Sequence, residues 1–457
     1  MRILLISSNI ANTPYPVYPL GLSMVASSLR KAGHEVRQFD FLASGRSTEA
    51  LLDEVREFTP EIIGISIRNI DNTNLLHEQR YINTDRDIVK EVRRVSPAKI
   101  VLGGSGFSIM PEAILHETGA DYGIVGEGEV SLVDFADKVA KGSYPQDKIL
   151  RSQERLSSSE IPSAFYDSKI MDFYLQSGNV ASVQTKRGCV HACVYCSYPF
   201  LEGNQLRPRE AKTVVDDIET LLNKHKAKYI FFTDSLFNDD QGHYLSVLRE
   251  MKRRSVVVPW TAFFKPQKFT KEALSLMKET GLKIVEIGAD GPTDTTLKKL
   301  GKSFTFEDVI TCNDLFTVYG IPTAHYFMFG CPGETKDTVL EGIENIKSLK
   351  KTVSFIFMGI RILPHTPLAK LAEIEGIISS GQDLLEPVYY IAPAISRKWI
   401  EETLTEAFRG IRNCVFPPDL LDSSVAFLHK LGYLGPLWEM LIPGNTKRNR
   451  KTHNVAK

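Results

Sequence analysis

Three cysteines stand close together in one loop of this sequence, at the spacing CxxxCxxC. They are Cys189, Cys193 and Cys196, and a strand-like run over 180–185 precedes them. Three thiolates can hold three irons of a [4Fe–4S] cluster, whose usual complement is four cysteines. The fourth iron is then open to a small molecule that brings its own donor atoms. The motif therefore predicts a reaction site in which the three cysteines are the metal ligands.

A zinc site and a disulfide are the alternatives for these cysteines. Structural zinc usually takes four N or S ligands, often from two paired motifs, whereas Cys312, Cys331 and Cys414 are isolated along the chain. His191 lies inside the loop, where a hydrogen-bonded or solvated histidine is the simpler interpretation. Disulfides are typical of short secreted chains, and this chain has 457 residues, six cysteines and no secretory signal. The pattern favours the cluster over zinc.

Composition narrows the possible partners. Lys and Arg together number 55, as do Asp and Glu, so the formal charge is zero. A balanced chain gives no electrostatic case for a nucleic-acid partner. No apolar run reaches the length of a membrane span. We therefore expect a cytoplasmic protein; the basic tail over 447–451 is expected to be solvated, with contact to an anionic lipid surface as the alternative.

The elements that must position the cysteines fall into four parts. Residues 1–145 alternate strand and helix, with strands over 3–7, 35–39, 62–67, 99–102 and 122–125. This alternation is typical of a doubly wound, Rossmann-like parallel sheet, whose ligands lie at the carboxyl ends of the strands. The loops there are rich in glycine, but no GxGxxG or P-loop pattern is present. Residues 146–178 are interpreted as a linker.

Residues 179–375 alternate again, and the rest of the chain is expected to be helical. Strands are predicted over 180–185, 229–232, 258–263, 284–287, 324–329 and 355–360. Conspicuous polar residues follow these strands, as in barrels whose chemistry lies at the strand ends. In the C-terminal region, 376–457, helices are predicted over 387–391, 396–409 and 419–430.

The cysteine loop resembles that of the radical S-adenosylmethionine (SAM) enzymes, whose motif CxxxCxΦC has an aromatic residue where Tyr195 stands. The resemblance implies a partial (β/α)6 barrel in which SAM binds the open iron and is cleaved to a 5′-deoxyadenosyl radical. Asp234 and Ser235 resemble the family's polar pair near SAM, and Asp290 matches the acidic residue near the SAM ribose and amino group.

Two further stretches carry the same resemblance. Residues 330–335 are similar to the family's GxPGET stretch, for which helix capping is the structural alternative. Arg361 is expected to pair with the SAM carboxylate or a substrate anion. For Arg361 and Asp234 the alternative is a buried ion pair at the barrel end.

The N-terminal part resembles the cobalamin-binding domain that precedes many radical SAM domains. The resemblance implies that the following residues bind cobalamin: Asn9, Pro19, Ser66, Arg68, Gly103, Gly104, Ser105, Gly126, Glu127 and Gly128. The DxHxxG signature that gives cobalt a histidine is absent, and Ser105 to Phe107 stand where many relatives have a histidine. Cobalt would thus keep a water, another side chain or no lower ligand. The alternative is a cobalamin-like fold without cobalamin.

Taken together, the chain resembles the class B radical SAM methyltransferases. This implies methylation of an unactivated carbon of a small or hydrophobic substrate, lipids included, with electrons from a flavodoxin- or ferredoxin-type donor. Non-methylating radical chemistry, such as ring contraction, cyclisation or carbon–carbon coupling, is the first alternative. A non-catalytic cobalamin or redox sensor is an alternative of another class. A tRNA methylthiotransferase is disfavoured, because no basic RNA-binding appendage or second cluster motif is present.

Overall fold

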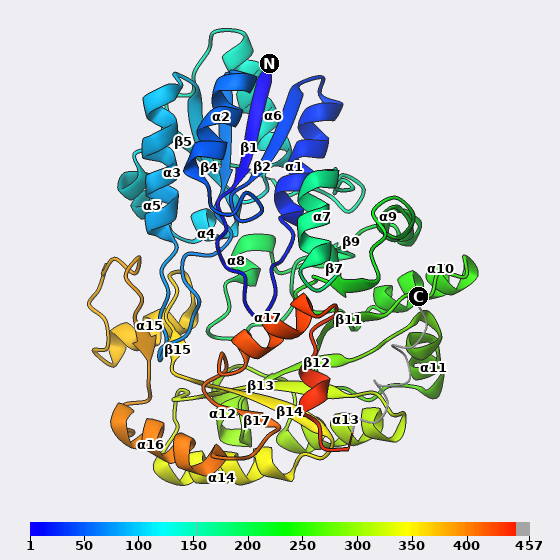
Figure 1. Cartoon of the computed structure of the whole chain (residues 1–457). Coiled ribbons are helices and arrows are strands. Elements are labelled where there is room, and N and C mark those ends of the chain that lie inside the picture. Colours follow the sequence, from blue (N-terminus) through cyan, green and yellow to red (C-terminus); the bar gives the residue numbers. More distant parts are fainter. Residues whose placement is uncertain (153, 445–457) are drawn as a thin grey trace.

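The computed structural model of the protein describes residues 1–152 and 154–444, which form two parallel sheets flanked by helices (Figure 1). The first sheet has the order β2-β1-β3-β4-β5-β6, and all its pairs are parallel. Its strands are β1 (Arg2–Ser7), β2 (Glu35–Asp40), β3 (Ile62–Ser66), β4 (Lys99–Gly103), β5 (Tyr122–Val125) and β6 (Ile149–Arg151).

Helices cover both faces of this sheet, which explains the continuous apolar runs of its strands. On β1, Leu4 and Ile6 belong to one buried cluster, while Ile3 and Leu5 belong to another on the opposite face. The helices are α1 (Leu20–Lys31), α2 (Thr48–Phe58), α3 (Ile82–Val95), α4 (Gly104–Ile109), α5 (Pro111–Thr118) and α6 (Gly128–Ala140). The doubly wound N-terminal domain is thereby confirmed.

The second sheet is an open parallel sheet in the order β17-β14-β13-β12-β11-β10-β7. Its strands are β7 (Val180–Val183), β10 (Tyr229–Phe232), β11 (Trp260–Phe264), β12 (Val285–Asp290), β13 (Thr323–Phe329), β14 (Thr352–Met358) and β17 (Cys414–Val415). Six of the seven are the predicted strands. The helices between them are α9 (Ala211–Asn223), α10 (His243–Arg253), α11 (Lys271–Thr280), α12 (Asp294–Lys299), α13 (Phe306–Val318) and α14 (Lys336–Ser348).

The remaining elements connect and cap the two domains. They are α7 (Ser168–Gln176), β8 (Lys186–Arg187), α8 (Tyr198–Glu202), β9 (Arg207–Pro208), β15 (Ile360–Arg361), α15 (Pro367–Ile374), β16 (Tyr389–Tyr390), α16 (Arg397–Phe408), α17 (Asp422–Lys430) and the 3₁₀ helix η1 (Trp438–Leu441). None of the helices in the described ranges is long and apolar enough to cross a bilayer.

Several elements differ from the sequence expectations. The stretch 146–178 contains β6, which extends the first sheet, and the helix α7. The helix predicted over 387–391 is wrong, because Tyr389 and Tyr390 form a strand that pairs antiparallel with β15. The C-terminal region also supplies β17, a seventh strand of the second sheet. The basic tail over 447–451 lies outside the described residues.

Candidate active site

The three cysteines of the motif lie in the loop between β8 and α8, and all three are half-buried and free of disulfides. The backbone holds this loop in place, since Cys189 N donates to Gly203 O at 3.0 Å and Cys196 N to Cys193 O at 3.1 Å. Gly188, just before the loop, has φ +89°, and a Cβ there would lie 2.0 Å from the Gln205 carbonyl oxygen. Only glycine fits this entry to the loop.

The thiols are suited to a shared cluster. Burial raises the pKa of Cys193 and raises that of Cys196 to about 12. Buried thiols lose their protons only where a nearby positive charge stabilises the thiolate, and bound iron ions would supply that charge. Within residues 1–152 and 154–444, no three His, Cys, Asp or Glu side chains are arranged to hold a single metal ion. The free thiols, their common loop and their shielding from water fit a three-cysteine cluster.

An ionic group stands beside the cysteines. Tyr195 donates its hydroxyl hydrogen to Asp290 at 2.5 Å, and Lys302 forms an ion pair with Asp290 and lies 3.1 Å from the Tyr195 oxygen. Burial acts to lower the pKa of Lys302, but the charge of Asp290 and the hydrogen bond to Cys193 raise it. Lys302 therefore places a fixed positive charge next to a cluster ligand. No motif marks it in the sequence.

Asp290 itself has an unusual backbone. It ends β12 with φ +67°, in the left-handed region that costs a non-glycine residue energy unless other contacts hold it there. Here Lys302 and Tyr195 provide those contacts. The predicted acidic residue thus lies next to the cysteine loop, where the amino group of a bound SAM would need a carboxylate.

Asp234 and Ser235, the predicted polar pair after β10, have different roles in the structure. Asp234 is buried and accepts hydrogen bonds from Thr185 N at 2.7 Å and from Lys186 Nζ at 2.9 Å. This is the buried ion pair foreseen as the alternative, and it joins the ends of the first two strands of the second sheet. Ser235 donates to the Gly188 carbonyl at 3.0 Å and so supports the cysteine loop.

Arg361 also forms a buried ion pair. Its Nε donates to Asp71 Oδ2 at 2.8 Å, and its other nitrogens donate to the carbonyls of Ile362 at 2.7 Å and Leu384 at 2.6 Å. Asp71 follows β3 in the first domain, so the pair connects the two domains. Each guanidinium nitrogen already has a protein acceptor, and the structure thus contains the ion pair rather than an arginine open to an anion.

The stretch over 330–335 is a capped turn. Glu334 accepts from Gly330 N at 2.5 Å and Cys331 N at 2.9 Å, and Thr335 caps α14 through a reciprocal pair of bonds with Thr338. Burial raises the pKa of Glu334 to about 7. The capping role expected as the structural alternative is therefore present.

A cavity of about 630 Å³ lies where the two domains meet. The first domain contributes the loops at the carboxyl ends of its strands, and the second contributes Ser182, Gln184, Ser197, Tyr198 and Thr233. All ten residues predicted to bind cobalamin line it: Asn9, Pro19, Ser66, Arg68, Gly103, Gly104, Ser105, Gly126, Glu127 and Gly128. The two domains thus face each other through their strand ends, with the cysteine loop at the border.

Arg68 is the cation in the lining of this cavity that has no ion-pair partner among the described residues, since Arg187 pairs with Glu127 and Glu129. Its side chain has accessible surface because it faces the cavity, but protein surrounds it, and this burial lowers its pKa. No carboxylate of the described residues pairs with it; the phenols of Tyr198, Tyr174, Tyr15 and Tyr81 are its neighbours. The Ser105 hydroxyl donates to the Arg68 carbonyl at 2.8 Å and fixes the loop. A glycine-walled cavity with one unpaired cation fits a bulky cofactor with polar substituents.

Gly104 shows how tightly the cavity wall is built. Its φ is +92°, and a Cβ would lie 2.6 Å from the Ile67 carbonyl oxygen. Gly104→Ala is expected to destabilise the cofactor-free protein by about 1–3 kcal/mol more than Gly33→Ala. Both substitutions place a side chain on a backbone with positive φ, but only the Cβ of Gly104→Ala also collides with a neighbouring atom. Gly33 has φ +88° and no atom within 4 Å of its Cβ position. Urea denaturation followed by circular dichroism measures the difference; equal losses would contradict the packing argument.

Glu127 and Glu129, which line the cavity, form ion pairs with arginines on either side of the cysteine loop. Arg187, two residues before Cys189, lies 2.5 Å from Glu129 and 3.1 Å from Glu127, and Arg207 lies 2.7 Å from Glu127. Burial acts to raise the pKa of Glu127, but the hydrogen bond from Arg207 and the charge of Arg187 lower it. The Glu127 side chain therefore forms ion pairs that join the two domains, and the residue also lines the cavity.

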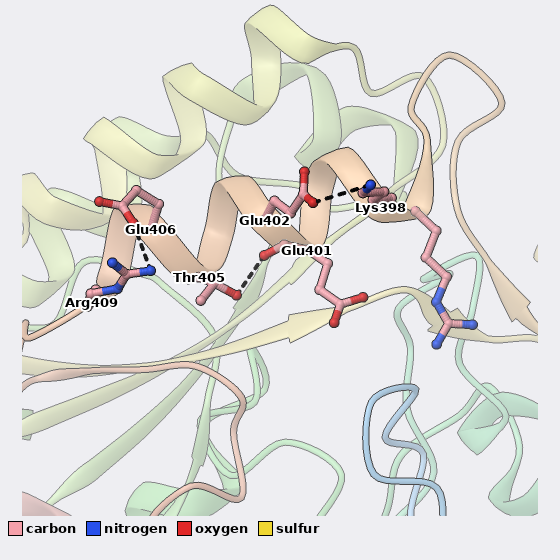
Figure 2. Close-up of a pocket in the computed structure, with 7 residues that line it drawn as sticks. Lys398, Glu401, Glu402, Thr405, Glu406 and Arg409 are labelled. Atoms are coloured by element: carbon pink, nitrogen blue, oxygen red, sulfur yellow. Dashed lines mark hydrogen bonds and ion pairs between the residues drawn. The ribbon is translucent and has the colours of Figure 1, made fainter.

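A second hollow lies on the surface along α16, and its lining is a charged, solvated helix face. Figure 2 shows Lys398 beside Glu402 and Glu406 beside Arg409, pairs one helical turn apart. Such exposed pairs contribute about 0.2–0.5 kcal/mol each to the helix. No side chain among those drawn has the environment of a reactive group.

Two protein families match parts of the sequence. Residues 6–136 match the B12 binding domain, and residues 183–346 match the radical SAM superfamily. The tryptophan 2-C-methyltransferase of Streptomyces laurentii is 28% identical, covering 78% of this chain and 72% of that protein. The cytidylyl-2-hydroxyethylphosphonate methyltransferase of Streptomyces wedmorensis is 23% identical, covering 63% of this chain and 64% of that protein.

Solved structures share the whole fold. The radical SAM methyltransferase TsrM from Kitasatospora setae, with cobalamin and a [4Fe–4S] cluster bound, superposes with a TM-score of 0.82 at 24% identity, covering 100% of this chain and 99% of that one. The same enzyme with tryptophan and a SAM analogue bound gives a TM-score of 0.84, covering 100% of both chains. The order of the domains and their mutual placement are thus shared.

Proposed function

We propose that this chain, which belongs to the cobalamin-binding radical SAM enzymes, methylates a carbon atom of a small organic substrate. One observation carries the proposal: the cavity lined by the cobalamin-type loops also includes Ser197 and Tyr198, which directly follow the last cysteine of the motif. A methyl donor and a SAM-binding cluster would therefore meet in one enclosed space. When bound, cobalamin would supply the methyl group, and the cluster with SAM would supply the radical that opens a C–H bond.

The residues of the chain have distinct roles in this proposal. Cys189, Cys193 and Cys196 would hold three irons, and Asp290 would accept hydrogen bonds from the SAM amino group or ribose. Asp234 and Ser235 would hold the cysteine loop against the strand ends. The ion pair between Arg361 and Asp71 and the network around Arg187 would keep the two domains together, and so exclude water from a radical reaction.

The relatives differ in substrate, and their names include tryptophan, a phosphonate and a hopanoid lipid as methyl acceptors. A hydrophobic or small substrate is common to these cases. We also infer a low-potential electron donor of the flavodoxin or ferredoxin type and a cytoplasmic location, because a cluster with an open iron needs a reducing compartment.

Transfer of a labelled methyl group tests the proposal without knowledge of the substrate. The full chain is reconstituted anaerobically with iron, sulfide and cobalamin, then reduced and given SAM that carries a deuterated methyl group. We expect the deuterated methyl group on cobalamin, detected by mass spectrometry, within minutes. Cleavage of SAM to 5′-deoxyadenosine without labelled cobalamin would favour non-methylating radical chemistry, and intact SAM would favour a sensor.

A further inference from the structure

Lys302 follows the turn that ends α12, and this turn packs on the cysteine loop. The carbonyl oxygen of Leu300 accepts a hydrogen bond from Val194 N at 3.0 Å. A Cβ on Gly301, whose φ is +76°, would lie 2.8 Å from the carbonyl oxygen of Ala192. Ala192 and Val194 flank the central cysteine of the motif. The turn therefore fixes the backbone of the lysine relative to that cysteine.

The Lys302 side chain reaches the central cysteine from the protein side. The side chain is 9% exposed, and its ammonium group forms a hydrogen bond with the thiol of Cys193. The same ammonium group lies 3.1 Å from the Tyr195 hydroxyl oxygen and 5.5 Å from the centroid of that ring. Its ion pair with Asp290 keeps it charged. A fixed cation thus contacts one of the three sulfur atoms that would bind iron.

Charge beside an iron–sulfur cluster affects how readily the cluster accepts an electron. Reduction by one electron adds one negative charge, and the reduction potential depends on nearby charge and on hydrogen bonds to the sulfur atoms. A cation that is shielded from water stabilises the more negative, reduced form more than the oxidised form. The charge of Lys302 should therefore raise the reduction potential, and the carboxylate of Asp290 beside it should lower the potential.

We propose that Lys302 is a positioning residue that sets the reduction potential of the cluster through Cys193, and that Asp290 limits this effect by pairing with the lysine. One electron from the external donor would convert the cluster from the 2+ to the 1+ state, and no proton moves in that step. The alternative is an ion pair that only holds Asp290 in its left-handed backbone conformation. The inference rests on the proposed function only in requiring that the three cysteines hold a cluster.

A redox titration followed by EPR measures this potential directly. The full chain is reconstituted anaerobically and titrated without SAM. Lys302→Met should make reduction at least about 10-fold less favourable, which lowers the potential of a one-electron couple by about 59 mV. Asp290→Asn should shift the potential in the opposite direction, because it leaves the ammonium group without its counter-charge. Asparagine tolerates a positive φ, so this variant retains the backbone conformation of residue 290.

Two further variants serve as controls. Lys298→Met removes an exposed lysine of α12, whose charge is screened by solvent, and should leave the potential unchanged. Lys302→Arg retains the positive charge and should restore most of the potential that Lys302→Met loses.

SAM cleavage separates a redox role from a structural one. Lys302→Met should cleave SAM slowly when reduced flavodoxin is the electron donor. Titanium(III) citrate, a stronger reductant, should restore much of the rate, because only the electron-transfer step is impaired. A purely structural defect would persist with both reductants.

The iron content of each variant decides how the titrations are interpreted. An unchanged or higher potential in Lys302→Met that retains its iron, or an equal shift in Lys298→Met, would overturn the inference and leave the proposed function intact. If Lys302→Met holds no cluster, a potential in Asp290→Asn that is unchanged or lower would overturn it. A wild-type chain without a cluster would overturn both the inference and the proposed function.

Discussion

Replacement of Cys193 by alanine is expected to lower SAM cleavage and methyl transfer by at least about 1,000-fold, because a [4Fe–4S] cluster cannot be held by two thiolates in this loop. Cys193 is the central cysteine, and Lys302 contacts it directly. Iron analysis, the EPR spectrum of the reduced protein and quantification of 5′-deoxyadenosine measure the loss. Iron content should fall together with activity.

Cys331→Ala is the matched control for that variant. Cys331 is fully buried, lies outside the cysteine loop and donates its thiol hydrogen to the Met328 carbonyl at 3.1 Å. Its loss should cost about 1 kcal/mol of stability and leave the iron content unchanged. SAM cleavage that persists in Cys193→Ala, or that disappears equally in Cys331→Ala, would show that the motif does not hold the cluster.

Arg187→Ala is expected to lower the free energy of unfolding by about 3–5 kcal/mol, because it leaves the buried carboxylate of Glu129 without a cation and leaves Glu127 with Arg207 alone. Burial alone would lower the pKa of Arg187, but the charges of Glu129 and Glu127 outweigh it and raise the pKa. The guanidinium is thus charged at every accessible pH. Since these contacts join the two domains beside the cavity, bound cobalamin should also be lost on gel filtration.

Arg253→Ala provides the comparison for this second variant. Arg253 pairs with Glu250 at 2.7 Å on an exposed helix face, where solvent screens the pair and it contributes little to stability. Urea denaturation of both variants and the cobalt content after gel filtration are the measurements. Similar losses in the two variants would mean that the network of Arg187, Glu127 and Glu129 does not hold the domains together.

Much of the fold follows from local patterns that depend on burial. The residues Ile3 to Ile6 are apolar without a break because both faces of their strand are covered. The three cysteines lie within eight residues of one another, so they share one loop regardless of how the rest of the chain folds. The cavity residues could be predicted because the carboxyl ends of parallel strands lie at one edge of the sheet.

The rest depends on contacts between distant segments. Asp71 and Arg361 are 290 residues apart, and nothing near either residue indicates the pairing. Lys302 follows a short helix with no motif, and only the folded chain brings it to Asp290. Tyr389 and Tyr390 form a strand only because β15 lies beside them.

Metal analysis of the anaerobically reconstituted full chain tests the central claim most directly: that a three-cysteine cluster and a corrin are held at one interdomain cavity. The wild type should hold about four irons and one cobalamin per chain, and the variant with Cys189, Cys193 and Cys196 all changed to alanine should keep the cobalamin and lose the iron. A wild-type chain that binds iron but no cobalamin, or a triple variant that retains its iron, would contradict it.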